Sequence, residues 1–322
     1  MTASRGTVVA PAPRPGDHVR LVSPASFPSR ELVAEAAAVL ESWGLVVEIG
    51  THALDRWGYM AGRDEDRLAD LDDAFRDPAV RAVIATRGGA GAYRIADDLD
   101  FAAVRADPKP LVGFSDITAL HLALWRHCGL AGIHGFLAGP RSAAATRRLL
   151  MDGEPAVLHR DPRAMTVEAE VPGAATGDLV GGNLGTVAHA VGAGLPSLAG
   201  TILFLEAERT IGLGQIDRQL TQLIRSGALD GVRGIALGRF PGFEDYTDRG
   251  WTLVDVFKDR LGSLGVPVLG GIDVGHGADP LSLPLGPLAV LDTAAGTLSV
   301  EPAVSSEDAD PRFPRAKCEG LR

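Results

Sequence analysis

The chain has 322 residues, a formal net charge of −10 and 46% hydrophobic residues. This length and this apolar content predict two packed lobes or one large α/β unit, and they exclude a chain that is disordered throughout. The chain has few lysines and no basic block, which excludes a nucleic-acid-binding function, because phosphate binding requires clustered positive charge.

The N-terminal residues 1–16 contain a short apolar stretch that Pro11, Pro13 and Pro15 interrupt, and this stretch is shorter than the core of a signal peptide. No run approaches the roughly 20 apolar residues of a membrane span. The two cysteines are too few for a disulfide framework, and no Cys/His cluster has zinc spacing. We therefore expect a cytoplasmic protein without a membrane partner.

The first third of the chain alternates between β-rich apolar runs and amphipathic stretches from His18 onward. Such alternation predicts a parallel sheet covered by helices. Gly44 predicts the end of one helix, while Asp64 and Glu65 suit the positive N-terminal end of the next. The predicted strands are residues 18–22, 46–49, 80–86 and 110–114, and the predicted helices are residues 30–43 and 64–75. We expect these elements to form a lobe of residues 17–150.

The pattern changes in residues 151–171, which are charged, contain proline and lack a clear period. We interpret them as the connection between two lobes. The predicted elements that follow are strands at residues 201–205, 234–237 and 288–291 and helices at residues 215–226 and 251–261. They indicate a second α/β or α+β lobe at residues 172–302. Residues 303–322 have little apolar content, and we expect them to be disordered.

Ser115 lies at the turn between a predicted buried strand and the helix that follows it. A residue at such a turn projects its side chain above the sheet, and the next backbone amide lies at a helix N-terminus, where it stabilises negative charge. Both properties are typical of a nucleophilic serine. The alternative is that Ser115 only caps the helix, and the usual Gly-x-Ser-x-Gly pattern lacks its second glycine here.

The glycine-rich segment Arg87-Gly-Gly-Ala-Gly91 also follows a strand, and its glycines allow a ligand to approach the backbone. One interpretation is that Gly88 or Gly89 supplies a second oxyanion-hole donor. A simple tight turn is the competing interpretation. A dinucleotide-binding loop is disfavoured, because the spacing does not fit Gly-x-Gly-x-x-Gly and the segment lies far from the first strand.

A nucleophilic serine needs a base, which histidine normally supplies, and the base needs an orienting carboxylate. His276 is the favoured base because it lies in a glycine-flanked loop, where functional side chains are often displayed. His134 and His189 are its rivals. Glu206 ends an almost entirely apolar strand, where an acid is costly unless it meets a partner. Asn183 follows two glycines and is suited to binding a carboxylate or peptide group, with a structural turn as the equal alternative.

Taken in order, these segments resemble the LD-carboxypeptidase family, which includes murein tetrapeptide carboxypeptidases and the immunity peptidases that inactivate microcin C-like antibiotics. The resemblance covers roughly residues 18–300 and rests on eight motifs. They are Val19-Arg-Leu-Val-Ser-Pro-Ala25, Gly58-Tyr-Met-Ala-Gly-Arg-Asp-Glu-Asp-Arg-Leu-Ala-Asp-Leu71, Arg87-Gly-Gly-Ala-Gly91, Gly113-Phe-Ser-Asp116, Gly181-Gly-Asn-Leu184, Leu203-Phe-Leu-Glu206, Ile216-Asp-Arg218 and Gly275-His276.

The resemblance implies a serine peptidase in which Ser115 attacks the scissile carbonyl, His276 moves the proton and Glu206 orients the imidazole. Glu208 is a second acid beside Glu206, but the motif match favours the first. The implied fold is a flavodoxin-like parallel-sheet lobe followed by a smaller α/β or α+β lobe, with the site between them. This chemistry requires no metal and no cofactor.

The resemblance also implies an oxyanion hole made by the backbone amides of Asp116 and of the turn at Gly88 and Gly89. It makes Asn183 a substrate-pocket residue. The chain departs from the family at Ala90, where family members often carry an aromatic residue. Substrate contacts on that side of the site therefore differ from the family pattern.

The implied function is hydrolysis of the amide bond before a terminal D-amino acid in cytoplasmic muropeptides, as in cell-wall recycling, by a homodimer. An alternative within the same chemistry is cleavage of peptidyl or aminoacyl nucleotide antibiotics, which needs an aromatic or apolar platform such as Trp57, Trp125 or Trp251. The alternative from another class is a non-catalytic small-molecule binding protein, because a fold alone does not establish activity.

Overall fold

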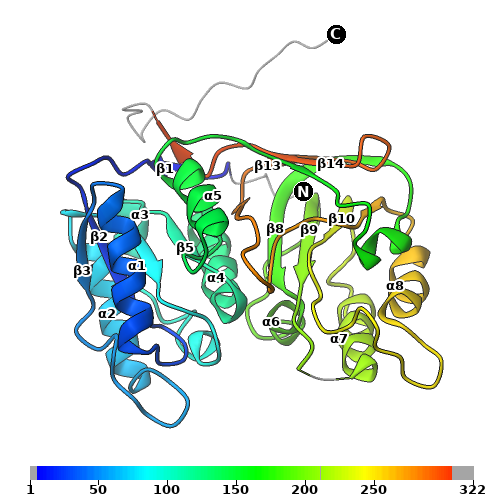
Figure 1. The fold of residues 1–322 in the computed structure, drawn as a ribbon, viewed down its shortest axis with the longest axis horizontal. Helices are drawn as coiled ribbons and strands as arrows, with labels where there is room; N and C mark the ends of the chain where they lie inside the picture. Colours follow the sequence, from blue (N-terminus) through cyan, green and yellow to red (C-terminus); the bar gives the residue numbers. More distant parts are fainter. Residues whose placement is uncertain (1–5, 211, 307–322) are drawn as a thin grey trace.

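The computed structural model of the chain describes residues 6–210 and 212–306. Two lobes lie side by side, each built on a β-sheet with helices packed against it (Figure 1). The first sheet has six strands, five of them from the first half of the chain, and the second sheet has seven strands. This arrangement confirms the predicted α/β class.

The strand order of the first sheet is β12-β6-β5-β4-β2-β3, and all neighbours are parallel except β12 and β6. Without β12 this is the flavodoxin order, in which the winding reverses between β2 and β4. Ligands of open α/β sheets bind beyond the carboxyl ends of the strands at such a reversal. The strands are β2 (His18–Val22), β3 (Val46–Ile49), β4 (Val80–Ala85), β5 (Leu111–Gly113), β6 (Gly132–His134) and β12 (Leu283–Leu285).

The helices of the first lobe bury one apolar face each against this sheet. In the first of them, Ser29 accepts the backbone N–H of Leu32 as a cap, and Val33, Ala36 and Leu40 are buried at helical spacing. The helices are α1 (Arg30–Ser42), α2 (Asp64–Arg76), α3 (Phe101–Ala106), α4 (Thr118–Cys128) and α5 (Pro140–Leu150), with short 3₁₀ turns η1 (Ala92–Arg94) and η2 (Ser115–Ile117).

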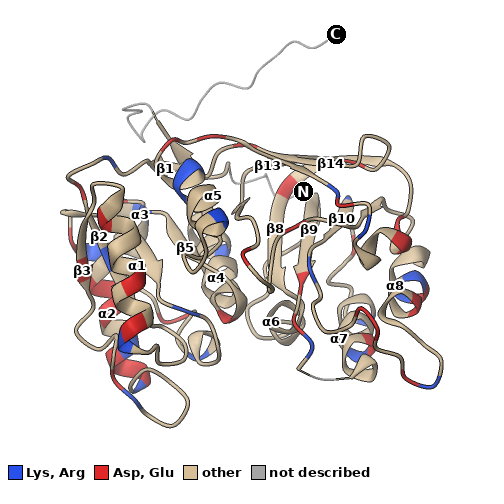
Figure 2. Ribbon diagram, in the orientation of Figure 1, with Lys and Arg blue, Asp and Glu red and all other residues tan. Residues whose placement is uncertain are grey.

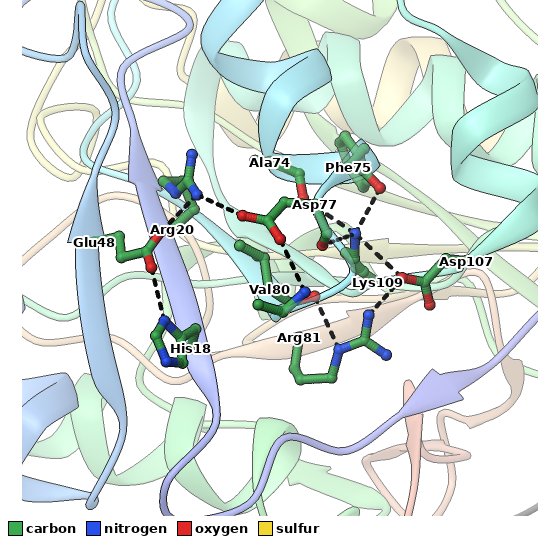
Figure 3. A network of polar contacts seen from close by, with 11 residues as sticks. His18, Arg20, Glu48, Ala74, Phe75, Asp77, Val80, Arg81, Asp107 and Lys109 are labelled. Carbon is green, nitrogen blue, oxygen red and sulfur yellow. Dashed lines mark hydrogen bonds and ion pairs between the residues drawn. The ribbon is translucent and has the colours of Figure 1, made fainter.

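A buried lysine joins the end of α2 to the segment that enters β5 (Figure 3). The Nζ of Lys109 donates hydrogen bonds to the carbonyl oxygens of Ala74, Phe75 and Asp77. The carboxylate of Asp107 lies 3.3 Å from the same nitrogen and balances its charge. Because a helix end leaves its last carbonyls without intrahelical partners, this lysine fixes α2 against the amino end of β5.

The strand order of the second sheet is β11-β10-β9-β8-β13-β14-β7, with parallel neighbours from β11 to β8 and antiparallel neighbours from β8 to β7. The strands are β7 (Ala156–His159), β8 (Ala174–Asn183), β9 (Thr201–Glu206), β10 (Gly234–Leu237), β11 (Val268–Leu269), β13 (Leu288–Asp292) and β14 (Thr297–Val300). The helices are α6 (Leu184–His189), α7 (Leu213–Arg225) and α8 (Leu253–Leu261), with 3₁₀ turns η3 (Met165–Ala169) and η4 (Gly262–Leu264).

The chain passes between the two lobes more than once. β12 belongs to the second half of the chain but pairs with β6 in the first sheet. β7 lies within residues 151–171, the segment that the sequence suggests as a connection, and pairs with β14. A core cluster contains side chains of both sheets, among them Leu21 and Ile133 of the first and Leu179 and Phe204 of the second. The lobes are therefore packed against each other through apolar contacts.

The last described residues do not follow the sequence prediction. β15 (Val304–Ser305) pairs in parallel with β1 (Ala10–Pro11), and Ala303 and Val304 are buried. The predicted disorder is thus wrong for residues 303–305, because a strand pairing from the far end of the chain covers their small apolar side chains. Residues 307–322 of the predicted tail lie outside the described residues.

Charged residues occur along the chain in both lobes, with Lys and Arg interspersed among Asp and Glu (Figure 2). Within the described part of the chain, no helix combines the length and the apolar character needed to cross a membrane.

Candidate active site

Ser115 lies just beyond the carboxyl end of β5, in the turn that leads into α4. Its φ is +61°, a left-handed value that is uncommon for a residue with a side chain and marks a constrained turn. This strand-turn-helix geometry is typical of a nucleophile elbow. A Cβ at Gly88 would lie 2.6 Å from the Cβ of Ser115, so only glycine fits beside it. The N-terminus of α4 has no side-chain cap, so the structure does not support the capping alternative.

The imidazole of His276 lies between Ser115 and Glu206. Its Nε2 is 3.2 Å from Oγ of Ser115, and its Nδ1 is 2.6 Å from Oε2 of Glu206. When Nδ1–H donates to Glu206, Nε2 is left as an acceptor for the hydroxyl proton of Ser115. The structure therefore brings together the three side chains that the sequence suggests for a triad, from β5, β9 and the loop before β12.

Burial and hydrogen bonding shift the pKa values of Glu206 and His276 in opposite directions. Burial alone would raise the pKa of Glu206, which is 0% exposed, but the hydrogen bond and charge of His276 outweigh it and hold that pKa below its usual value. Burial alone would lower the pKa of His276, but the Glu206 carboxylate outweighs it and raises that pKa above 6.5. Glu208 also raises it, with Oε1 3.9 Å from Nε2, although Glu208 is more than half exposed. Glu206 is thus the buried partner of the imidazole.

Two neighbours hold Glu206 in place. Asn183 is its register partner on β8, and its Nδ2 donates to Oε1 of Glu206 at 3.4 Å. The Oδ1 of the same amide accepts the backbone N–H of Thr186 and caps α6. A Cβ at Gly275 would lie 2.6 Å from Oε2 of Glu206, so the loop can approach the carboxylate only with glycine there. Asn183 therefore has a positioning role that the sequence did not indicate.

Side chains tie the glycine-rich segment of residues 88–92 to the Ser115 loop and to the loop that follows β2. The carboxylate of Asp116 accepts the backbone N–H of Ala92 at 2.7 Å, and Oγ of Ser26 accepts that of Ala90 at 3.1 Å. Burial raises the pKa of Asp116 to about 6. Sequence reasoning considered only the backbone amide of Asp116 and missed Ser26, although Ser26 directly follows the first quoted motif. An oxyanion hole formed by the backbone amides of Asp116 and of the turn at Gly88 and Gly89 stays a prediction.

Among the described residues, the hydroxyl of Ser115 has no hydrogen bond with His134 or His189, the two rivals of His276. His134 is 1% exposed, its ring packs edge-on against Phe114 and Phe204, and neither ring nitrogen has a hydrogen-bond partner among the described residues. Burial lowers its pKa to about 4. His189 ends α6 and is exposed.

Two cavities open near Ser115. The small cavity has a volume of about 350 Å³, and the large cavity has a volume of about 700 Å³. Side chains lining the small cavity include Glu35, Arg87, Phe114, Ser115, Phe136, Glu208 and His276. Side chains lining the large cavity include Asp97, Asp116, Asn183, His189, Gln215 and Gln219. Gly89 lines both, so the two cavities meet at the glycine-rich turn beside the serine.

The fold and the site together define a two-lobed α/β protein with a serine, a histidine and a glutamate joined at its candidate site. The LD-carboxypeptidase N-terminal domain matches residues 19–135, and the LD-carboxypeptidase C-terminal domain matches residues 176–291. The chain therefore belongs to the LD-carboxypeptidase family. The first matched range contains the serine, and the second contains the glutamate and the histidine of the site.

Relatives agree with this assignment, and a solved structure agrees with the fold. The chain is 35% identical to the "Probable murein peptide carboxypeptidase" of Bacillus subtilis (strain 168), over 90% of this chain and 93% of that protein. It is 34% identical to the murein tetrapeptide carboxypeptidase of Pseudomonas aeruginosa, over 85% of this chain and 92% of that protein. The structure of MccF in complex with glutamyl sulfamoyl guanosine has the same fold, with a TM-score of 0.81 at 21% identity, covering 92% of this chain and 100% of that one.

Proposed function

We propose that the chain is a serine-type LD-carboxypeptidase that hydrolyses the amide bond before the terminal D-amino acid of a muropeptide. The observation that carries this proposal is the relay from Ser115 through His276 to the buried Glu206, with distances of 3.2 and 2.6 Å. The names of the murein carboxypeptidase relatives support the substrate class.

In this proposal, Oγ of Ser115 attacks the carbonyl carbon of the scissile amide while Nε2 of His276 takes its proton. Glu206 stabilises the imidazolium that forms. The backbone amides of Asp116 and of the turn at Gly88 donate to the oxyanion. Collapse of the tetrahedral intermediate breaks the C–N bond, and the imidazolium gives its proton to the leaving amine.

Water then releases the acyl group. His276 takes a proton from the water as its oxygen attacks the ester carbonyl, and it returns that proton to Oγ of Ser115 when the ester breaks. The products are a peptide shortened by one residue and a free D-amino acid. The proposal includes action on muropeptides in the cytoplasm during cell-wall recycling and a homodimeric state, both of which rest on the family resemblance.

Cleavage of an aminoacyl nucleotide is the alternative within the same chemistry. A nucleotide base needs an aromatic platform, and Trp57, Trp125 and Trp251 were the sequence candidates for it. Among the described residues that line the two cavities near the serine there is no tryptophan. Phe114 and Phe136 line the small cavity and Tyr93 lines the large cavity, so aromatic side chains are present and the cavity lining does not separate the two substrates. The names of the murein carboxypeptidase relatives favour the muropeptide.

The test is release of D-alanine, followed by mass spectrometry, from a murein tetrapeptide and from its diastereomer with a terminal L-alanine. An aminoacyl sulfamoyl adenosine is incubated in parallel. Release of D-alanine alone by the wild type, reduced at least about 10³-fold in Ser115→Ala, is the expected result. Cleavage of the nucleotide alone would assign the chain to the immunity peptidases, and binding without cleavage of any substrate would favour the binding-protein alternative.

A further inference from the structure

The two cavities differ in how they face the relay. His276 lines the small cavity, whereas the large cavity is lined by Asp116 and Asn183. In amide hydrolysis the base that accepted the serine proton must next reach the nitrogen of the leaving group. The leaving residue must therefore lie on the side of Ser115 that His276 faces, which is the small cavity.

The sizes of the two cavities agree with a leaving residue in the small cavity and the rest of the peptide in the large cavity. A carboxypeptidase releases one residue and retains the rest of the peptide on the enzyme as the acyl group. The volume of about 350 Å³ is ample for a single small residue, and the volume of about 700 Å³ is suited to the longer acyl portion. The lining amides of Gln215 and Gln219 in the large cavity can hydrogen-bond to peptide groups.

The small cavity is also lined by Arg87, whose guanidinium makes no hydrogen bond or ion pair with the other described residues. Arg87 directly follows Thr86 beyond the end of β4, and its side chain lines this cavity and is exposed. Within residues 6–210 and 212–306, no hydrogen bond or ion pair involves its guanidinium, whereas Arg67 and Arg94 of the same lobe are both paired with Asp64. A free guanidinium beside a nucleophile is suited to bidentate binding of a carboxylate.

We infer that the small cavity is the leaving-residue subsite, and that Arg87 binds the free α-carboxylate of the terminal amino acid. This inference rests on the proposed function and deepens it, because it explains how the site distinguishes the end of a peptide from its interior. An internal amide would place a neutral peptide group, which lacks the carboxylate, against Arg87.

Two acidic residues in the same cavity make the positive charge of Arg87 more important for binding a carboxylate. Glu35 on α1 and Glu208 after β9 both line the small cavity and would repel a substrate carboxylate, and Arg87 is the one arginine or lysine among the described residues that line it. Replacement of Arg87 therefore removes an attraction and leaves a repulsion. Replacement of Glu35 by glutamine has the opposite sign, because it removes part of that repulsion.

The test compares kcat/KM for a murein tetrapeptide that ends in D-alanine with kcat/KM for the same peptide ending in D-alaninamide. The wild type is expected to prefer the carboxylate. Arg87→Met is expected to lower kcat/KM for the carboxylate by about 10- to 100-fold while changing that for the amide little. Glu35→Gln, the matched control in the same cavity, is expected to keep or increase the preference.

A fluorophosphonate that lacks a carboxylate monitors the integrity of the site in each variant, because it reacts with an activated serine irrespective of Arg87. An unchanged rate of labelling in Arg87→Met, together with loss of the preference for the carboxylate, supports the inference. If the wild type releases D-alanine and Arg87→Met keeps the full preference, the inference is overturned and the proposed function stands. If the wild type cleaves neither peptide, both are overturned.

Discussion

Glu206 and His276 are joined twice, because Oε2 of Glu206 accepts both the Nδ1–H and the backbone N–H of His276, at 2.6 and 3.0 Å. The carboxylate therefore fixes the loop as well as the ring. Since Glu206 is fully buried at the end of β9, its charge is compensated mainly through this one residue and the amide of Asn183.

Glu206→Gln is predicted to lower kcat of D-alanine release on the order of 10³- to 10⁴-fold with little loss of folding. The amide keeps the size of the side chain but cannot stabilise the imidazolium, and it favours the wrong tautomer of His276. Steady-state kinetics and circular dichroism check this prediction. A variant that is folded and loses less than 10-fold in kcat would show that Glu206 only positions the loop.

The pH dependence of kcat/KM is predicted to follow His276. The base must be neutral, and its pKa lies above 6.5, so activity is expected to fall as the pH falls through a value above 6.5. Glu208→Gln removes one of the charges that raise this pKa and is predicted to shift the acid limb to lower pH. An unshifted limb in Glu208→Gln would mean that Glu208 does not act on the imidazole.

Gly88→Ala is predicted to lower kcat/KM by at least about 10²-fold, because its Cβ would lie 2.6 Å from that of Ser115 and displace the nucleophile. Gly214→Ala is the matched control. A Cβ at Gly214, in α7, would meet nothing within 4 Å, so this change is expected to leave activity intact and to stabilise the helix slightly. Equal activity in the two variants would contradict the close packing at Ser115.

Acid is predicted to destabilise the fold through His134 and His121, which are buried and whose pKa values burial lowers to about 4. Since the folded pKa lies below the unfolded value of 6.5, this stability is complete above pH 6.5 and is lost as the pH falls towards 4. Each histidine contributes on the order of 2 kcal/mol to the loss between pH 7 and pH 5.

His134→Leu is therefore expected to reduce the difference in free energy of unfolding between pH 7 and pH 5, as measured by denaturant titration. The effect is cleanest at His134, because neither of its ring nitrogens has a described hydrogen-bond partner. Identical pH dependence in wild type and variant would show that His134 is hydrated or protonated in the folded state.

Much of the fold could be predicted from local patterns. The predicted strand at residues 18–22 and the helix at residues 30–43 match β2 and α1 to within a residue, because apolar periodicity and capping are local properties. β12 could not be predicted, since a strand of three residues gains its place by pairing with β6, which lies about 150 residues earlier in the chain. The pairing of β15 with β1 has the same non-local origin.

In the candidate site, too, some residues have a local sequence signal and others are explained only by contacts between distant parts of the chain. Ser115 stands out in the sequence because it follows a buried strand, and Glu206 stands out because it ends one, where a buried acid needs a partner. His134 was a rival of His276 because the sequence does not show that its ring lies between Phe114 and Phe204. The lack of a partner for Arg87 is likewise visible only when the surrounding side chains are placed.

The most direct test of the account is to treat the wild type, Ser115→Ala and His276→Ala with a fluorophosphonate and to locate the adduct by peptide mass mapping. The account predicts a single adduct on Ser115 in the wild type, none in Ser115→Ala, and much slower labelling in His276→Ala. Labelling of a different serine, or the same rate in wild type and His276→Ala, would contradict the assignment of Ser115 as a nucleophile activated by His276.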